Sequence, residues 1–308
     1  MRLVFAGTPA AAVPTLRRLA AEHEIVAVVT RPDAPLGRKR ILTPSPVAQE
    51  AEALGIHVIK AARLDEDATG RIAALRPELG VIVAYGGLVR EPLLSTPAHG
   101  WINLHFSLLP AWRGAAPVQR ALIAGDAELG ATVFQLVPAL DAGAVHAVQV
   151  FPVADDATAD DALASLAEDG AGLTAAAVAA IAAGTARPVP QEGEPTHAAK
   201  LDLSDGLLDW TEPAAAVFAR YRGVTSEPGA HTTIDGAPLK VRELARAADA
   251  DPLAPGELRG VKRGVLVGTA TDPLLLVRVQ PAGRPVMAAA DWFRGLRAGA
   301  GSTVRLGA

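Results

Sequence analysis

The chain has 308 residues, of which 50% are hydrophobic, and it carries a net charge of −4 and no cysteine. This length predicts two domains, since domains usually hold roughly 100–200 residues. The missing cysteines exclude disulfides, thiolate nucleophiles and cysteine-based zinc sites. The apolar stretches are shorter than the ~20 residues that a membrane span needs, and the apolar run at the N-terminus is too short for a signal sequence. We therefore expect a soluble cytoplasmic protein without membrane contact.

The first 150 residues alternate short strand-like runs with segments of helical periodicity. Helices are expected at Val13–Ala21, Pro46–Leu54 and Arg71–Leu75. Strands are expected at Arg2–Ala6, Ile25–Thr30, His57–Ile59, Val81–Ala84, Trp101–His105, Ala131–Leu136 and Val145–Val150. This alternation predicts an α/β fold with a mostly parallel sheet covered by helices on both faces. Ligands would then bind outside the carboxyl ends of the strands, where the strand order reverses.

The second half of the chain has a different composition. Residues 155–183 are rich in alanine and start with aspartates, which predicts one or two closing helices. We expect a first domain at 1–183, a linker at 184–205 that is rich in Pro and Gly, and a second domain at 206–308. The runs 239–241, 265–269 and 274–279 fit a small β-rich domain such as a barrel, with Trp210 and Trp292 in its core.

The charge differs between these two parts. Residues 1–205 carry 16 Lys and Arg against 23 Asp and Glu, whereas residues 206–308 carry 13 against 10. A basic tail domain on an acidic body permits an anionic partner without requiring one.

Two loops follow the first two predicted strands. Gly7-Thr8-Pro9 lacks the spaced glycines of a dinucleotide site and the Gly-Lys-Ser/Thr of a P-loop, so a tight turn is the simpler interpretation. The second loop, Arg31–Ser45, has four basic residues against Asp33 alone, and Ser45 can cap a helix that starts at Pro46. Structureless loops of this length are usually functional or disordered.

The strongest chemical signal is WINLHFSLLPAWRGAAP at residues 101–117. Asn103 and His105 lie two apart on a predicted strand, so they share one face. An amide can donate to the oxyanion of a tetrahedral intermediate, and an imidazole can move protons near neutral pH. Asp141, 36 residues later, could orient or charge the imidazole. Spacing alone ranks this trio only slightly above an ordinary histidine at a strand end. The other histidines show no spacing typical of metal ligands, so no metal is expected.

With these residues the sequence resembles the folate-dependent formyltransferases, through Asn-x-His-x-Ser-Leu-Leu-Pro-x-Trp-Arg-Gly-Ala-Ala-Pro followed by Leu-Asp-x-Gly. Matches at FAGTP (5–9), RPDAPLGR (31–38), TPSPV (43–47), VAYG (83–86) and QPAGRPVM (280–287) extend the resemblance along the chain. It is similar above all to the members that formylate methionine on initiator methionyl-tRNA. The resemblance implies a Rossmann-like catalytic domain, a linker and an OB-like C-terminal β-barrel that contacts tRNA. It also implies 10-formyltetrahydrofolate as formyl donor.

The resemblance assigns roles to residues at matching positions. Asn103, His105 and Asp141 would be catalytic, with Asn103 and protonated His105 stabilising the formyl oxygen and Asp141 raising the proton affinity of the imidazole. Folate would be bound by Ser107, Leu108, Leu109 and Pro110 and by Tyr85, Gly86, Gly87 and Leu88. Arg38, Lys39 and Arg40 would contact tRNA. Phe106 and Ala142 depart from the glycine and threonine common in the family, which bears on backbone geometry and donor contacts and leaves the trio intact.

Two alternatives remain open. One is formyl transfer to a small amine such as glycinamide ribonucleotide or an amino sugar; the second domain and the basic loop argue against it. The other is a non-catalytic module that binds tRNA or folate, against which the intact trio argues. We expect the protein to act as a monomer.

Overall fold

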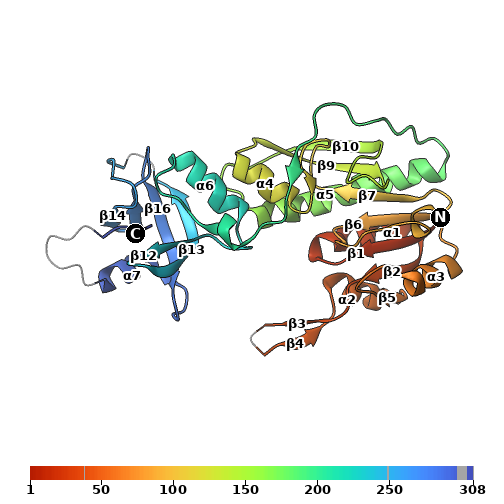
Figure 1. Ribbon diagram of the computed structural model, residues 1–308, viewed down its shortest axis with the longest axis horizontal. Coiled ribbons are helices and arrows are strands. Elements are labelled where there is room, and N and C mark those ends of the chain that lie inside the picture. Colours follow the sequence, from red (N-terminus) through yellow and green to blue (C-terminus); the bar gives the residue numbers. More distant parts are fainter. Residues whose placement is uncertain (38, 248–249, 297–303, 308) are drawn as a thin grey trace. The chain divides into compact units, whose positions relative to one another are not determined.

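The computed structural model describes residues 1–37, 39–247, 250–296 and 304–307. It divides into two compact units (Figure 1), which are described separately below. Unit 1 comprises Met1–Pro117, Glu128–Pro152 and Leu163–Ala198, and unit 2 comprises Val118–Ala127, Val153–Ala162 and Ala199–Ala308. Two short stretches that precede most of α5 in the chain thus belong with the C-terminal part. The expected division at 183/184 and 205/206 stays a prediction.

A seven-stranded sheet forms the centre of unit 1, with the order β10-β9-β7-β6-β1-β2-β5 (Figure 1). Its strands are β1 (Arg2–Gly7), β2 (Glu24–Thr30), β5 (Val58–Lys60), β6 (Leu79–Val83), β7 (Trp101–His105), β9 (Glu128–Gln135) and β10 (Val145–Pro152). Neighbours among β7, β6, β1, β2 and β5 pair in parallel, whereas β9 and β10 pair antiparallel. The predicted α/β class, with a Rossmann-like and mostly parallel sheet, is confirmed.

The helices of unit 1 are α1 (Val13–Glu22), α2 (Pro46–Ala53), α3 (Glu66–Ala74) and α5 (Ala159–Ala182), whose first turn belongs to unit 2; η1 (Ala10–Ala12) and η2 (Leu93–Ser95) are short 3₁₀ turns. Two of these helices, α2 and α3, begin where a short polar side chain caps them. Ser45 accepts the N–H of Ala48 at 3.0 Å, so α2 starts at Pro46 as predicted. Asp65 caps α3 in the same way, so this helix starts five residues before the predicted Arg71. Of the one or two helices expected within 155–183, the structure has one, α5.

The basic stretch Arg31–Ser45 is a correction to the sequence analysis, because it is not structureless. It folds into an antiparallel hairpin of β3 (Ala34–Leu36) and β4 (Ile41–Thr43). Strands of three residues, one of them with Pro35 at its centre, are too short for an alternation pattern to show. Leu36, Ile41 and Leu42 of this hairpin are 62–67% exposed.

A tight contact in unit 1 fixes β7, which carries the candidate site, against β6. Trp101 at the start of β7 is fully buried, and its indole N–H donates to the Leu93 carbonyl at 2.9 Å. The opposite residue on β6 is Gly80, where a Cβ atom would lie 2.1 Å from the Trp101 ring. Only glycine leaves room for this indole, so the pair fixes the register of the two strands.

Unit 2 is built on an antiparallel sheet with the order β12-β13-β16-β15-β14, and β17 pairs with β16. The strands are β12 (His231–Ile234), β13 (Ala237–Arg246), β14 (Leu258–Val261), β15 (Gly264–Val267), β16 (Leu274–Pro281) and β17 (Met287–Ala288). The helical elements are α4 (Pro117–Ala124), η3 (Leu203–Gly206), α6 (Ala214–Gly223) and α7 (Ala289–Gly295). The three strands expected here are confirmed, and the structure adds β12, β14 and β17.

The last described residues bridge both edges of this sheet. Leu306 forms a β-bridge with Ile234 on β12, and Arg305 forms one with Glu257, just before β14. The Leu306 N–H also donates to the Gly256 carbonyl at 2.8 Å. A Cβ atom at Gly256, whose φ is +73°, would lie 2.4 Å from the Leu306 carbonyl oxygen. Because one segment pairs with both edges, the sheet is closed as a barrel, in line with the expectation.

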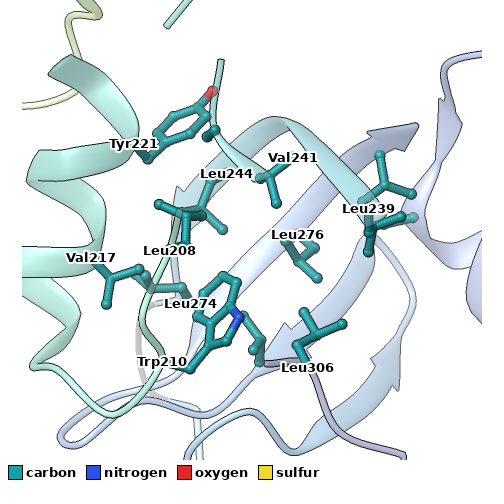
Figure 2. Close-up of a cluster of buried hydrophobic side chains, with 14 of the residues drawn as sticks. Leu208, Trp210, Val217, Tyr221, Leu239, Val241, Leu244, Leu274, Leu276 and Leu306 are labelled. Carbon is teal, nitrogen blue, oxygen red and sulfur yellow. The ribbon is translucent and has the colours of Figure 1, made fainter. Parts of the chain in front are cut away.

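The core of unit 2 lies between α6 and the concave side of the sheet (Figure 2). Trp210, Leu239, Leu276 and Leu306 are all at most 4% exposed. The Trp210 indole N–H donates to the buried Thr232 hydroxyl at 2.9 Å, so its polar atom is satisfied. Trp210 and Trp292 both belong to this core, as predicted. Among the described residues, no helix is both long and apolar enough to cross a membrane.

Candidate active site

The topology of unit 1 gathers several loops at one edge of the sheet. Because β6 and β7 are parallel neighbours, the segments after Val83 and after His105 leave the sheet at the same edge. The strand order reverses between β1 and β6, since the chain moves from β1 to β2 and returns on the other side. Ligand crevices of open α/β sheets lie at such a point, outside the carboxyl ends. The segments after Asn103 and His105 and the predicted folate segments therefore leave the sheet where a ligand is expected, whereas Asp141 comes from the β9–β10 turn.

Asn103 and His105 lie on one face at the end of β7, as the period of two predicts. The imidazole of His105 is only 6% exposed. Its Nε2 lies 2.9 Å from the Trp112 carbonyl oxygen, which can only accept, so Nε2 carries a hydrogen. The Phe134 ring packs edge-on against the imidazole, with 6.4 Å between the ring centroids. The Nδ1 edge therefore remains for a second partner.

That second partner is Asp141, whose Oδ2 lies 4.0 Å from His105 Nδ1. This distance exceeds a hydrogen bond, as expected when neutral imidazole already holds its proton on Nε2. Burial lowers the pKa of His105 below its ordinary value of 6.5; the Asp141 carboxylate and the Trp112 carbonyl oppose this shift without cancelling it. The lowered pKa and the contact of Nε2 with the Trp112 carbonyl both favour the neutral imidazole in the absence of ligand.

The turn between β9 and β10 gives Asp141 its position. Asp141 has φ +45°, a left-handed conformation that aspartate adopts more readily than most residues. Its Oδ2 accepts the Gly114 N–H at 2.8 Å, which aims the carboxylate at the histidine. At Gly143 a Cβ atom would lie 1.7 Å from the Gln135 carbonyl oxygen, so the turn needs glycine there. The Leu-Asp-Ala-Gly pattern is thus explained by backbone geometry as well as by the carboxylate.

Asn103 is the trio member whose side-chain oxygen has no partner in the part of the chain that the structure describes. Its Oδ1 is buried, and within the described residues it has no hydrogen bond. Leaving such an acceptor unpaired costs about 1–3 kcal/mol. An amide that is kept unpaired on the same face as His105 is suited to a bound substrate.

The two predicted folate segments are held differently. In the first, Ser107 donates to the Ala111 carbonyl at 2.6 Å, and Thr132 donates to the Ser107 carbonyl at 2.7 Å. Leu108 packs on Gly130, where a Cβ atom would lie 2.1 Å from its side chain. In the second, burial raises the pKa of Tyr85, whereas Leu88 is 67% exposed. Gly86 has φ +76°, so the chain turns sharply between these two residues.

Comparisons with known proteins agree with this architecture. Residues 1–178 match the family described as "Formyl transferase", and residues 200–297 match "Formyl transferase, C-terminal domain". The chain is 61% identical over 297 residues to the methionyl-tRNA formyltransferase of Clavibacter sepedonicus, covering 96% of this chain and 97% of that relative. The chain belongs to the methionyl-tRNA formyltransferase family. This similarity does not favour the first alternative, formyl transfer to a small amine.

Two solved structures share the fold at low sequence identity. An N-formyltransferase from Helicobacter canadensis, solved with folinic acid and dTDP-3-aminofucose, has a TM-score of 0.69 at 16% identity, covering 91% of this chain and 98% of that one. HypX from Aquifex aeolicus, solved with tetrahydrofolic acid, has a TM-score of 0.63 at 17% identity. That alignment covers 95% of this chain, which spans about half of HypX (47%).

Two of the predicted tRNA contacts, Lys39 and Arg40, lie apart from the trio in the chain, between β3 and β4. Lys39 and Arg40 are exposed there, and Arg38 lies outside the described residues. Within the described residues, no three His, Asp or Glu side chains converge as they would around a metal ion.

Sequence analysis missed two contributors to this edge of the sheet. Thr8, in the turn after β1, has a buried hydroxyl without a hydrogen bond among the described residues, at the point where the strand order reverses. The other is the return segment, defined here as Arg187–Ala198, which follows α5 within unit 1. Its Thr196 hydroxyl accepts the Trp112 N–H at 2.9 Å, and its β11 (His197–Ala198) pairs in parallel with β8 (Arg113–Gly114). Its Pro- and Gly-rich composition is typical of a linker, so its place at this edge of the sheet is shown only by its contacts.

Proposed function

We propose that this chain transfers the formyl group of 10-formyltetrahydrofolate to the α-amino group of methionine on initiator methionyl-tRNA, acting as a monomer in the cytoplasm. The observation that carries the proposal is the arrangement at the end of β7. A buried neutral imidazole faces a carboxylate at 4.0 Å, beside an amide oxygen that lacks a partner. The relatives named methionyl-tRNA formyltransferase support the choice of acceptor.

In the proposed mechanism, His105 acts first as a base. The attacking amine must lose a proton as it bonds to the formyl carbon, and the free position on the imidazole is Nδ1, because Nε2 donates to Trp112. Once Nδ1 is protonated, Asp141 lies close enough to form an ion pair with it. His105 then returns this proton to the leaving nitrogen of the donor. General acid–base catalysis of this kind contributes typically ~10²–10⁴-fold.

Asn103 serves the same step by hydrogen bonding. Its buried Oδ1 can accept an N–H of the substrate, which removes the cost of an unpaired oxygen. Its NH₂ group can donate to the formyl oxygen as that oxygen gains negative charge. The donor supplies an already activated formyl group, so the reaction needs neither a metal nor a nucleotide as energy source. The segments 85–88 and 107–110 would hold the donor next to this face.

The acceptor would be contacted at the hairpin and by unit 2. Lys39 and Arg40 are exposed cations beside exposed Leu36, Ile41 and Leu42, a surface suited to the end of a nucleic acid strand. Arg38 belongs to the same proposal through the family resemblance. The +3 charge of residues 206–308 favours phosphate contacts in unit 2.

The proposal is tested by measuring transfer of labelled formyl from 10-formyltetrahydrofolate to three acceptors under identical conditions. Initiator methionyl-tRNA should be formylated with the highest kcat/KM, elongator methionyl-tRNA less well, and glycinamide ribonucleotide not measurably. Efficient transfer to the small amine would overturn the acceptor assignment. Folate binding without transfer to any acceptor would favour the non-catalytic alternative. Sedimentation of the protein alone tests the monomer.

A further inference from the structure

The side-chain amide of Gln191 is joined to the turn that carries Asp141. Gln191 Nε2 donates to the Asp141 carbonyl at 2.8 Å and to the Gly143 carbonyl at 2.9 Å. Its Oε1 accepts from Arg113 Nη2 at 2.6 Å. Both N–H groups and the oxygen of the amide are therefore engaged. Gln191 is half-buried, whereas residues 187–190 and 192–197 on either side of it are exposed.

The position of Asp141 depends on such support. Its carboxylate receives one backbone N–H, from Gly114, and its own backbone is held in the left-handed region. A left-handed non-glycine residue persists only when its surroundings fix it, at a cost of order 1–3 kcal/mol. Gln191 binds the carbonyl of this residue and the carbonyl two residues further on. It thereby bridges the turn across Ala142, where the family commonly has threonine.

We propose that Gln191 is a positioning residue for formyl transfer, which keeps the Asp141 carboxylate at the Nδ1 edge of His105. The inference rests on the proposed function of the trio. Gln191 lies in the return segment. Another residue of this segment, Thr196, holds Trp112, whose carbonyl accepts from the imidazole. Val189 and Val145 exchange backbone hydrogen bonds at 2.7 and 2.9 Å, and Thr196 holds the N–H of Trp112. One segment thus supports both groups that face the histidine.

The chemistry of the contacts explains why the residue is glutamine. Two carbonyl oxygens require a donor pair, and the Arg113 guanidinium requires an acceptor, which only a terminal amide combines at this size. Glutamate would keep the Arg113 contact and set a carboxylate against two carbonyl oxygens. Methionine would keep the length and lose all three hydrogen bonds. These two substitutions separate the role toward Asp141 from the role toward Arg113.

The test uses the full chain with Gln191→Met, Gln191→Glu and, as a matched control, Glu192→Gln, an exposed neighbour. Single-turnover formylation of initiator methionyl-tRNA at saturating donor should fall by about 10- to 100-fold in both Gln191 variants, because small misplacements of reacting groups cost up to ~10²-fold. The control should keep the wild-type rate, and the melting temperatures of all variants should stay close. If Gln191→Glu kept its activity, the contact of Gln191 that matters would be the one with Arg113, and the proposal would be overturned.

A second readout needs no substrate. The groups that face the imidazole among the described residues are Asp141, the Trp112 carbonyl and the Phe134 ring, and Asp141 is the charged one. Because its carboxylate raises the pKa of His105, loosening it should lower that pKa. NMR titration of His105, assigned with His105→Gln, should show this shift in Gln191→Met and in Asp141→Asn.

The double variant decides between positioning and mere structural support. If Gln191 acts through Asp141, Gln191→Met should change neither the rate nor the His105 pKa further in the Asp141→Asn background. Additive losses, or an unchanged His105 titration in Gln191→Met, would overturn the proposal. A wild-type chain that does not formylate methionyl-tRNA would instead contradict the proposed function. In that case the titration still decides whether Gln191 positions Asp141.

Discussion

The core of unit 2 and the end of β7 differ in the hydrogen bonding of their buried polar atoms. In the core of unit 2, the indole N–H of Trp210 meets the Thr232 hydroxyl at 2.9 Å, and the surrounding side chains are apolar. At the end of β7, the buried Asn103 oxygen has no partner among the described residues, and both Trp112 and Asp141 have positive φ. Each such departure costs of order 1–3 kcal/mol.

This difference shows which region is shaped for stability and which for a ligand. Substitutions in the core of unit 2 should change the free energy of unfolding, while those at the end of β7 should change the rate of transfer and little else. Each prediction below either sharpens this contrast or breaks it.

The largest effect is expected for the trio. His105→Ala should lower the single-turnover rate by ~10²–10⁴-fold, and Asn103→Ala should lower it by ~10²–10³-fold as an oxyanion donor is lost. Asp141→Asn should lose most activity while the protein folds normally. Rates are measured together with melting curves of each variant. Near wild-type rates in folded His105→Ala would show that the reaction takes place elsewhere.

In unit 2, Leu276→Ala should lower the free energy of unfolding by about 2–5 kcal/mol, because it leaves a cavity at a fully buried position. Denaturant titration measures this loss. Below the melting transition, donor binding should stay unchanged, since the folate segments belong to unit 1. A matched exposed change, Leu203→Ala, should alter stability by less than about 0.5 kcal/mol. A comparable loss in both variants would contradict the assignment of this core.

For the hairpin, Lys39→Ala and Arg40→Ala should weaken the use of methionyl-tRNA and leave donor affinity unchanged. Each lost phosphate contact should reduce the log–log salt slope by roughly 0.7–0.9. Arg63→Ala, which removes an exposed cation outside the hairpin, serves as control. A contact to bases would instead reduce discrimination between initiator and elongator tRNA with the slope preserved. An unchanged profile in all variants would leave the hairpin without a role in recognition.

The smallest effect is the pH dependence of stability. Since burial lowers the pKa of His105 below 6.5, the unfolded chain binds this proton more tightly than the folded chain. The contribution of His105 to stability is therefore lost as the pH falls below about 6.5, down to the folded pKa. His23 and His146 shift in the same direction, so the comparison must be wild type against His105→Gln. The variant should lose less stability between pH 7 and pH 5; equal slopes would contradict a buried neutral imidazole.

Much of the fold could be predicted because its signals are local. The strand Trp101–His105 has the predicted bounds, and α2 starts at the predicted Pro46 because Ser45 caps it. The short strands β3 and β4 were missed, since three residues give no readable alternation. The return segment was missed for another reason. Its prolines and glycines indicate a linker, and its hydrogen bonds to Asp141, Arg113 and Trp112 join residues 50, 78 and 84 positions apart.

That Asn103 and His105 share a face follows from the sequence alone, because side chains on a strand alternate with a period of two. The sequence also predicts the alternation of strands and helices that places this face at the carboxyl edge of a parallel sheet. Only the tertiary structure decided that His105 is buried and neutral at rest, and that Asp141 lies 4.0 Å from it. Burial and long-range contacts depend on which distant segments pack together, and no local pattern records that.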